Sequence, residues 1–215
     1  MKKKLDLGFY FITDRTLSKN GVLEDVKAAL NAGVRVVQYR EKTLATAAMV
    51  DEARKIAELC RGKAIFIVND RIDVALASGA DGVHIGPDDI DIEDARKLLG
   101  GGRIIGVTAN SVEEAKRCEE LGADYVSISP IFLTQTKKDA GQPLGLNAIR
   151  EARRVLRIPF TVIGGINLAN LNDVLDAGAK SVSMISAVLK ANDVEAEIRK
   201  IREAMHGHSA RKGKE

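Results

Sequence analysis

Two periodicities of apolar residues alternate along the chain. Short apolar runs rich in β-branched residues, such as KAIFIVND at 63–70, are typical of buried strands. Longer stretches between them carry apolar residues at helical spacing, as in SVEEAKRCEELG at 111–122. The pattern therefore predicts strands that alternate with helices.

A repeat underlies this alternation, because a glycine followed by a short β-prone run occurs at intervals of roughly 45 residues. The aligned glycines are expected just past helices, where the left-handed conformation carries no Cβ penalty. The repeated segments are NAGVRVVQYR (31–40), ASGADGVHIG (77–86), ELGADYVSIS (120–129) and DAGAKSVSMI (176–185), with Gly33, Gly79, Gly122 and Gly178 aligned. Between or before them lie GFYFITD (8–14), KAIFIVND (63–70), GRIIGVTAN (102–110) and IPFTVIGG (158–165).

These segments together predict eight strands in strict alternation with helices. That order favours an α/β fold, a single (β/α)8 TIM barrel, over residues 1–205. A solenoid could have repeats of this length, and a doubly wound open sheet is the structural rival, but the latter rarely reaches eight parallel strands in so short a chain. Residues 206–215 are polar and are expected to form a disordered tail.

Length, composition and charge are ordinary for one soluble domain. The chain has 215 residues, no tryptophan and a net charge of +3 that comes largely from its two ends, which does not indicate nucleic-acid binding. Cys60 and Cys118 lack metal-type spacing and are interpreted as buried hydrophobes. Asp6 and Asp14 interrupt any apolar signal region, and no run is long enough to span a membrane, so we expect a cytoplasmic protein without membrane partners.

Polar residues gather where the predicted strands end. Alternate residues of a barrel strand face the lumen, which places Gln38 and Arg40 on one face of their strand and Ser127 and Ser129 on one face of theirs. Barrel enzymes carry their sites at the carboxyl ends of the strands. We therefore expect the functional site at this end.

Acidic residues follow two neighbouring predicted strands, as Asn69-Asp70 and as Asp88-Asp89. Oxygen ligands from two loops, completed by water, are how proteins hold Mg²⁺ beside phosphates. Helix N-capping is the alternative for each residue taken alone. Two such pairs on adjacent strands favour the metal.

The strand ends also predict two anion-binding regions. Arg40 and Lys42 follow one strand beside the acidic pairs, and an Arg directed into the lumen needs an anionic partner. Gly164-Gly165 and Ile185-Ser186 follow the last two strands, where barrels frequently bind phosphate. The loop TQTKKD (134–139) could reach both regions. A Mg²⁺–pyrophosphate unit and a separate monophosphate would explain this division.

In order along the chain, these motifs resemble the thiamin phosphate synthase (thiamin-phosphate pyrophosphorylase) family from about Tyr10 to Val188. The resemblance implies a (β/α)8 barrel that joins hydroxymethylpyrimidine diphosphate to thiazole monophosphate, giving thiamin phosphate and pyrophosphate. It implies a transferase with small-molecule substrates and Mg²⁺ as cofactor, working by a dissociative substitution without a strong general base. The motifs are QYREK (38–42), VND (68–70), HIGPDD (84–89), GVTAN (106–110), TQTKKD (134–139), GGI (164–166) and SMISA (183–187).

The resemblance also implies roles for individual residues. Asp70 and Asp89 would hold the metal, and Arg40, Lys42 and Lys137 would be catalytic by neutralising charge on the leaving group. Direct substrate contacts are expected from Gln38, Tyr39, Arg40, Glu41, Lys42, Asn69, Thr108 and Lys137 for the pyrimidine diphosphate, and from Thr134, Gln135, Thr136, Gly165, Ile185 and Ser186 for the thiazole phosphate.

Three positions depart from the family's common pattern: Pro87, Leu133 and Thr108, of which Thr108 keeps a hydroxyl. A thiazole tautomerase-like or regulatory barrel protein of thiamin metabolism is the alternative function. The retained Arg40, Asp70 and Asp89 argue against it. An isomerase acting on a phosphosugar would need an acid–base pair in the lumen, and His84 is interpreted as a hydrogen-bonded lumen histidine instead.

Overall fold

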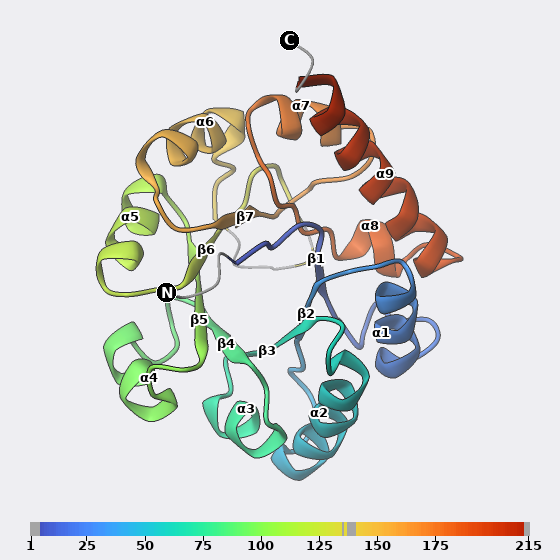
Figure 1. Ribbon diagram of the computed structural model, residues 1–215, viewed down its shortest axis with the longest axis vertical. Coiled ribbons are helices and arrows are strands. Elements are labelled where there is room, and N and C mark those ends of the chain that lie inside the picture. Colours follow the sequence, from blue (N-terminus) through green and yellow to red (C-terminus); the bar gives the residue numbers. More distant parts are fainter. Residues whose placement is uncertain (1–4, 135, 137–140, 213–215) are drawn as a thin grey trace.

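The structure is a computed structural model that describes residues 5–134, 136 and 141–212 (Figure 1). In this part of the chain, parallel strands pair in sequence order from β1 to β7 and wrap around a central lumen, as predicted. Their bounds are β1 Tyr10–Ile12, β2 Val36–Tyr39, β3 Ile65–Asn69, β4 Gly82–Ile85, β5 Ile104–Ala109, β6 Tyr125–Ile128 and β7 Phe160–Val162.

The eighth predicted strand is reduced to a bridge residue that closes the barrel. Val182 forms parallel bridges with Phe9 and with Val162. The amide of Tyr10 donates to the Val182 carbonyl at 2.9 Å, and the amide of Ser183 donates to the Val162 carbonyl at 2.9 Å. A full strand does not develop because the chain turns into helix α8 at Ser186. The (β/α)8 architecture is therefore confirmed, with a shortened last strand.

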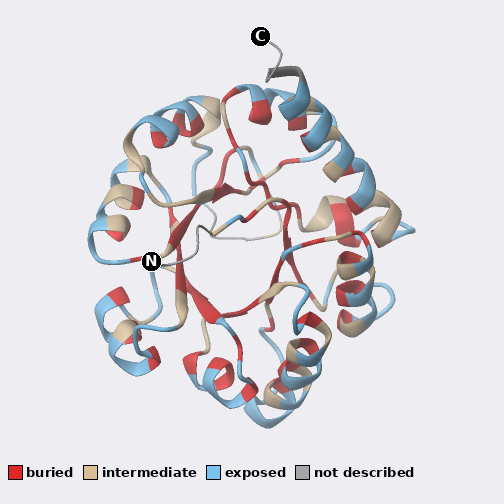
Figure 2. Cartoon of the chain, viewed as in Figure 1, coloured by how far each residue is buried: buried red, intermediate tan, exposed pale blue. Residues whose placement is uncertain are grey.

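The helices form a ring outside the strands, with their buried faces turned toward the barrel (Figure 2). One apolar core fills the space between strands and helices, and a smaller one, which includes Tyr10, Val36, Ile67 and Tyr125, fills the lumen. The helix bounds are α1 Val22–Asn31, α2 Thr46–Cys60, α3 Ile72–Ser78, α4 Ile92–Leu99, α5 Val112–Glu120, α6 Gly145–Val155, α7 Leu171–Asp176, α8 Ser186–Leu189 and α9 Val194–Lys212.

The repeated glycines end helices as predicted. Gly33, Gly79, Gly122 and Gly178 have φ values of 80°, 74°, 95° and 106°, in the left-handed region. Each lies directly after the last residue of a helix or one residue later, where it lets the chain turn into the next strand.

The prediction of a disordered tail from residue 206 is wrong as far as Lys212, because α9 continues to that residue. Ile198, Ile201 and Met205 bury one face of α9 against the barrel. The His208 Nε2 lies 2.9 Å from an Asp176 carboxylate oxygen, which joins the last turns of α9 to α7. Packing of an amphipathic face thus extends a helix that composition alone did not indicate.

The cysteines are buried and free, as interpreted from the sequence. Burial raises the pKa of the Cys60 thiol to about 12. Among the residues that the structure describes, no helix is both long and apolar enough to cross a membrane.

Candidate active site

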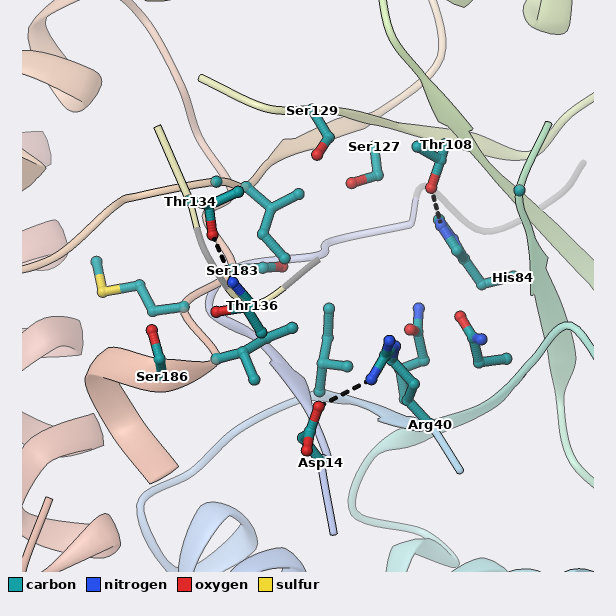
Figure 3. Close-up of a pocket in the computed structure, with 18 of the residues that line it drawn as sticks. Asp14, Arg40, His84, Thr108, Ser127, Ser129, Thr134, Thr136, Ser183 and Ser186 are labelled. Atoms are coloured by element: carbon teal, nitrogen blue, oxygen red, sulfur yellow. Dashed lines mark hydrogen bonds and ion pairs between the residues drawn. The ribbon is translucent and has the colours of Figure 1, made fainter. Parts of the chain in front are cut away.

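A cavity of about 840 Å³ opens at the carboxyl ends of the strands, the end at which the sequence predicted a site. Side chains from successive strands line it, including Gln38 of β2, Asn69 of β3, His84 of β4, Thr108 of β5 and Ser127 of β6. Figure 3 shows polar groups directed into this space. The alternation expected from the sequence therefore places polar residues in the upper lumen, above its apolar floor.

Arg40 lines the cavity and is held by an aspartate from the preceding strand's loop. Its guanidinium donates to the Asp14 carboxylate at 2.8 Å (Figure 3), and its backbone amide donates to the Thr13 hydroxyl at 2.9 Å. Asp14 is only 6% exposed and also accepts from Thr16. Asp14 thus supplies the anionic partner that a lumen arginine was expected to need, and the donors not used by Asp14 remain for a ligand.

Two carboxylates and a lysine meet beside Arg40. Lys42 Nζ lies 2.5 Å from the Asp70 Oδ2, and the Asp70 carboxylate is near enough to Asp89 to raise the pKa of Asp89. Asp70 has a φ of 60°, unusual for a residue other than glycine. The loop after β3 therefore holds this carboxylate in a constrained position.

Helix N-capping does not explain these aspartates. Helix α3 has Arg71 at its N-cap position, and α4 is capped by Asp91, whose side chain accepts from the Asp94 amide. Asp89 instead accepts from the Gly86 amide at 2.7 Å, within its own loop. The capping alternative is therefore wrong for Asp70 and Asp89.

The pKa of Asp89 is raised above its ordinary value. Burial is the main cause, and the adjacent Asp70 carboxylate adds to it, while Gly86 and Lys42 act in the opposite direction. Two facing carboxylates favour a cation between them. No cluster of three or more His, Cys, Asp or Glu side chains with metal-ligand geometry occurs among the described residues. A metal at this pair would need further oxygen ligands from substrate or water.

The other side of the cavity is lined by backbone and hydroxyl groups. Gly165 follows β7 with a φ of 64°, and a Cβ there would lie 2.4 Å from the Leu133 carbonyl oxygen. Glycine is needed because the two loops pack backbone against backbone. Thr134 and Ser186 lie on the wall beside it. Thr136 and Ile185 line the same wall, as the sequence predicted.

Tyr39 and Glu41 do not line the cavity, although direct substrate contact was expected of them. The Tyr39 hydroxyl donates to Glu52 of α2 at 2.8 Å, on the helix side of the strand. Glu41 accepts from Arg15 at 2.5 Å and from Thr43 at 2.6 Å. The strand alternation explains this, since odd-numbered residues of β2 face the helices.

The Glu41 carboxylate is strongly held in its ionised form. Its side chain is 1% exposed, and that burial alone would raise its pKa. Hydrogen bonds from Thr43, Arg15 and the Leu44 amide outweigh burial and lower the pKa of Glu41 to about 2. Glu41 thus anchors the segment that carries Arg40 and Lys42.

The remaining residues that the sequence singled out have different outcomes. His84 is a hydrogen-bonded lumen histidine, as interpreted, with its ring nitrogens 2.9 Å from the hydroxyls of Tyr125 and Thr108. Pro87 and Leu133, two of the departures from the family pattern, lie at the cavity rim. Gln135 and Lys137 lie outside the described residues.

Several cavity residues were missed by sequence reasoning. Asp14 ends the first apolar run, GFYFITD, and could have been found by treating that strand end like the others. Ser183 follows the alternation of its short strand. Asn167 and Lys190 also line the cavity, but they lie in loops whose positions no local pattern indicates.

Comparisons with known proteins point to one family. Residues 9–188 match the family model described as thiamine monophosphate synthase. The thiamine-phosphate synthase of Methanosarcina barkeri is 54% identical over 192 residues, which span 89% of this chain and 87% of that protein. The corresponding protein of Moorella thermoacetica is 46% identical and spans 92% and 94% of the two chains.

A solved structure named thiamine phosphate pyrophosphorylase, from Pyrococcus furiosus, superposes with a TM-score of 0.87 at 38% identity, over 94% of this chain and 97% of that one. A 3-hexulose-6-phosphate synthase structure superposes with a TM-score of 0.66 at 21% identity, which shows the fold alone. With a family model matched across most of its length and relatives of this identity, the chain belongs to the thiamine monophosphate synthase family.

Proposed function

We propose that this chain condenses hydroxymethylpyrimidine diphosphate with thiazole monophosphate, forming thiamin phosphate and releasing pyrophosphate. The observation that carries the proposal is one continuous cavity with two polar regions of different character. One has Arg40 and Lys42 beside a pair of carboxylates, and the other has glycine backbone and hydroxyl groups. A metal-bound diphosphate suits the first, and a monophosphate suits the second.

Asp70 and Asp89 are the residues that would hold Mg²⁺. Their neighbouring carboxylates supply hard oxygen ligands, and the raised pKa of Asp89, caused by burial and by Asp70, supports a need for positive charge there. Mg²⁺ bound there would neutralise negative charge on the leaving pyrophosphate. Diphosphate and water oxygens would complete a coordination sphere that two carboxylates cannot fill.

Arg40 and Lys42 would bind the diphosphate. Asp14 fixes the Arg40 guanidinium at 2.8 Å, so its remaining donors can be oriented before substrate arrives. Lys42 is 55% exposed and contacts Asp70, and its long side chain can move from that carboxylate to a phosphate oxygen. Lys137, by the family resemblance, would add a further cation.

The proposed bond cleavage places growing negative charge next to these cations. The amino group of the pyrimidine can donate electrons toward the methylene, so C–O cleavage precedes attack by the thiazole nitrogen. That nitrogen has no proton to lose. The site therefore needs charge neutralisation rather than a strong base, in keeping with a His84 whose two ring nitrogens contact Tyr125 and Thr108.

A thiazole tautomerase-like or regulatory protein remains the second candidate. It would need the monophosphate region but not a cationic region with paired carboxylates. The proximity of Arg40, Lys42, Asp70 and Asp89 in one part of the cavity favours the synthase.

A coupling assay tests the proposal. Purified protein is mixed with the pyrimidine diphosphate, thiazole phosphate and Mg²⁺, and thiamin phosphate and pyrophosphate are measured together, with and without chelator. Equal appearance of both products, abolished by chelator, is the expected result. Binding of thiazole phosphate without product would instead favour the tautomerase-like or regulatory function.

A further inference from the structure

A chain of hydrogen bonds crosses the lumen beneath the cavity. The Gln38 Nε2 donates to the Tyr10 hydroxyl at 2.9 Å, and the hydroxyls of Tyr10 and Tyr125 lie 2.6 Å apart. The Tyr125 hydroxyl lies 2.9 Å from the His84 Nδ1, and the His84 Nε2 lies 2.9 Å from the Thr108 Oγ1. Figure 3 shows the last link. The chain thus connects Gln38 and Thr108, which line the cavity, through Tyr10, Tyr125 and His84, of which His84 also lines it.

The packing around the chain is specific. Tyr10 and Tyr125 are at most 1% exposed. The Tyr125 ring lies over Gly106 of β5, where a Cβ would be 1.9 Å from the Tyr125 Cζ. Only glycine at this position lets the ring cross the lumen and reach His84. A buried polar chain of this kind persists because each member is satisfied by its neighbours.

The chain has a direction, because each hydroxyl has only one proton to donate. Burial raises the pKa of Tyr10 and of Tyr125, so both phenols keep their protons. Starting from the Gln38 amide, the direction in which each hydroxyl donates within the chain has Tyr10 donating to Tyr125 and Tyr125 donating to the His84 Nδ1. In this direction the His84 Nδ1 accepts, so the ring carries its proton on Nε2 and donates it to Thr108.

We propose that Tyr10, Tyr125 and His84 are positioning residues that couple the orientation of the Gln38 amide to that of the Thr108 hydroxyl. The Gln38 carbonyl is thereby turned away from Tyr10, and the Thr108 proton is left to point into the cavity. The site offers one fixed acceptor and one fixed donor at separate strands. A heteroaromatic ring that carries an amino group and an acceptor nitrogen complements this pair.

The direction is a property of the fold, whereas its consequence for the pyrimidine substrate rests on the proposed function. Two measurements test the direction of the hydrogen bonds and its consequence for the substrate separately. The first is the tautomer of His84 in the protein without substrate, read from ¹⁵N–¹H correlations of the histidine rings by NMR. A variant with both His206→Asn and His208→Asn, in α9, leaves His84 as the remaining histidine and assigns its signals.

A proton on Nε2 with an unprotonated Nδ1 is the expected result. An Nδ1–H tautomer or an imidazolium would overturn the proposed direction. Neither result depends on turnover, so failure of the coupling reaction would overturn the proposed function and leave this test intact.

The second measurement is the kinetic effect of breaking the chain. Tyr125→Phe and Tyr10→Phe each remove one hydroxyl and keep the ring, so either variant serves if the other does not fold. Loss of one buried hydrogen bond is expected to lower kcat/KM for the pyrimidine diphosphate roughly three- to tenfold. The KM for thiazole phosphate should stay unchanged, which general misfolding would not produce.

Ser78→Ala is the matched control, because it removes a buried hydroxyl on α3, away from the lumen. It should leave both substrates' constants unchanged. Equal kcat/KM for the pyrimidine diphosphate in wild type and in both Phe variants would overturn the positioning role. Equal losses of kcat/KM for the pyrimidine diphosphate and for thiazole phosphate would also overturn the positioning role.

Discussion

Glu41 offers a quantitative test of how the site is anchored. Its carboxylate is buried against Arg15 and Thr43 and is ionised in the folded protein, with a pKa of about 2, against 4.5 for an ordinary glutamate. A depressed pKa contributes stability that is present above pH 4.5 and is lost as pH falls through the folded pKa. The difference in pKa corresponds to about 3 kcal/mol in the free energy of unfolding.

The perturbation is Glu41→Gln, which keeps the shape and removes the charge. Between pH 6 and pH 3, wild type should lose about 2 kcal/mol of unfolding free energy through this one group. The Glu41→Gln variant has no carboxylate at this position, so its free energy of unfolding should not fall by this amount. Urea unfolding followed by circular dichroism at a series of pH values gives the free energy of unfolding of both proteins. The difference between the two free energies should become smaller as the pH falls.

The control is Glu24→Gln, which removes one partner of an exposed ion pair with Lys27. Surface pairs of this kind contribute little, so its curve should run parallel to that of wild type. Parallel curves for wild type and Glu41→Gln would refute the reasoning. They would mean that the hydrogen bonds to Glu41 do not lower its pKa below the value that it has in the unfolded chain.

Other predictions concern the cavity and the core. Asp89→Asn should weaken Mg²⁺ activation and lower kcat roughly 10²–10³-fold, measured in the coupling assay, and an unchanged metal dependence would contradict the assignment. Gly165→Ala should raise the KM for thiazole phosphate and lower the melting temperature, because its Cβ would lie 2.4 Å from the Leu133 oxygen. Gly62→Ala is the comparison: Gly62 has a φ of 71° and no atom within 4 Å of an added Cβ, so this variant should lower the melting temperature only through backbone strain. Cys60, with its pKa raised to about 12 by burial, should react with an aromatic disulfide reagent at pH 8 only on unfolding.

The barrel was predictable because its signals are local. Short apolar runs identified the strands, helical spacing identified the helices between them, and the glycines at 33, 79, 122 and 178 marked the helix ends. Strand ends then placed Arg40 and Asp70 at the same edge, since parallel strands in a barrel end together. The predicted eighth strand was too long, because only Val182 forms bridges and the chain enters α8 at Ser186.

The partners of these residues depend on how distant segments meet. Arg40 binds Asp14 across neighbouring loops, and Tyr10 contacts Tyr125 from a position 115 residues away in the sequence. The strand pattern gives the face on which each side chain lies, but not which residue it meets there.

The sequence by itself determined the order of strands and helices, the end of the barrel that carries the site and many of the polar residues that line it. Only the tertiary structure decided that Tyr39 contacts Glu52, that Lys42 contacts Asp70 and that α9 continues through Lys212. The physical reason is the separation along the sequence of the residues that interact. Periodicity is set by neighbours a few residues apart, whereas pairing, burial and helix extension depend on closure of the barrel.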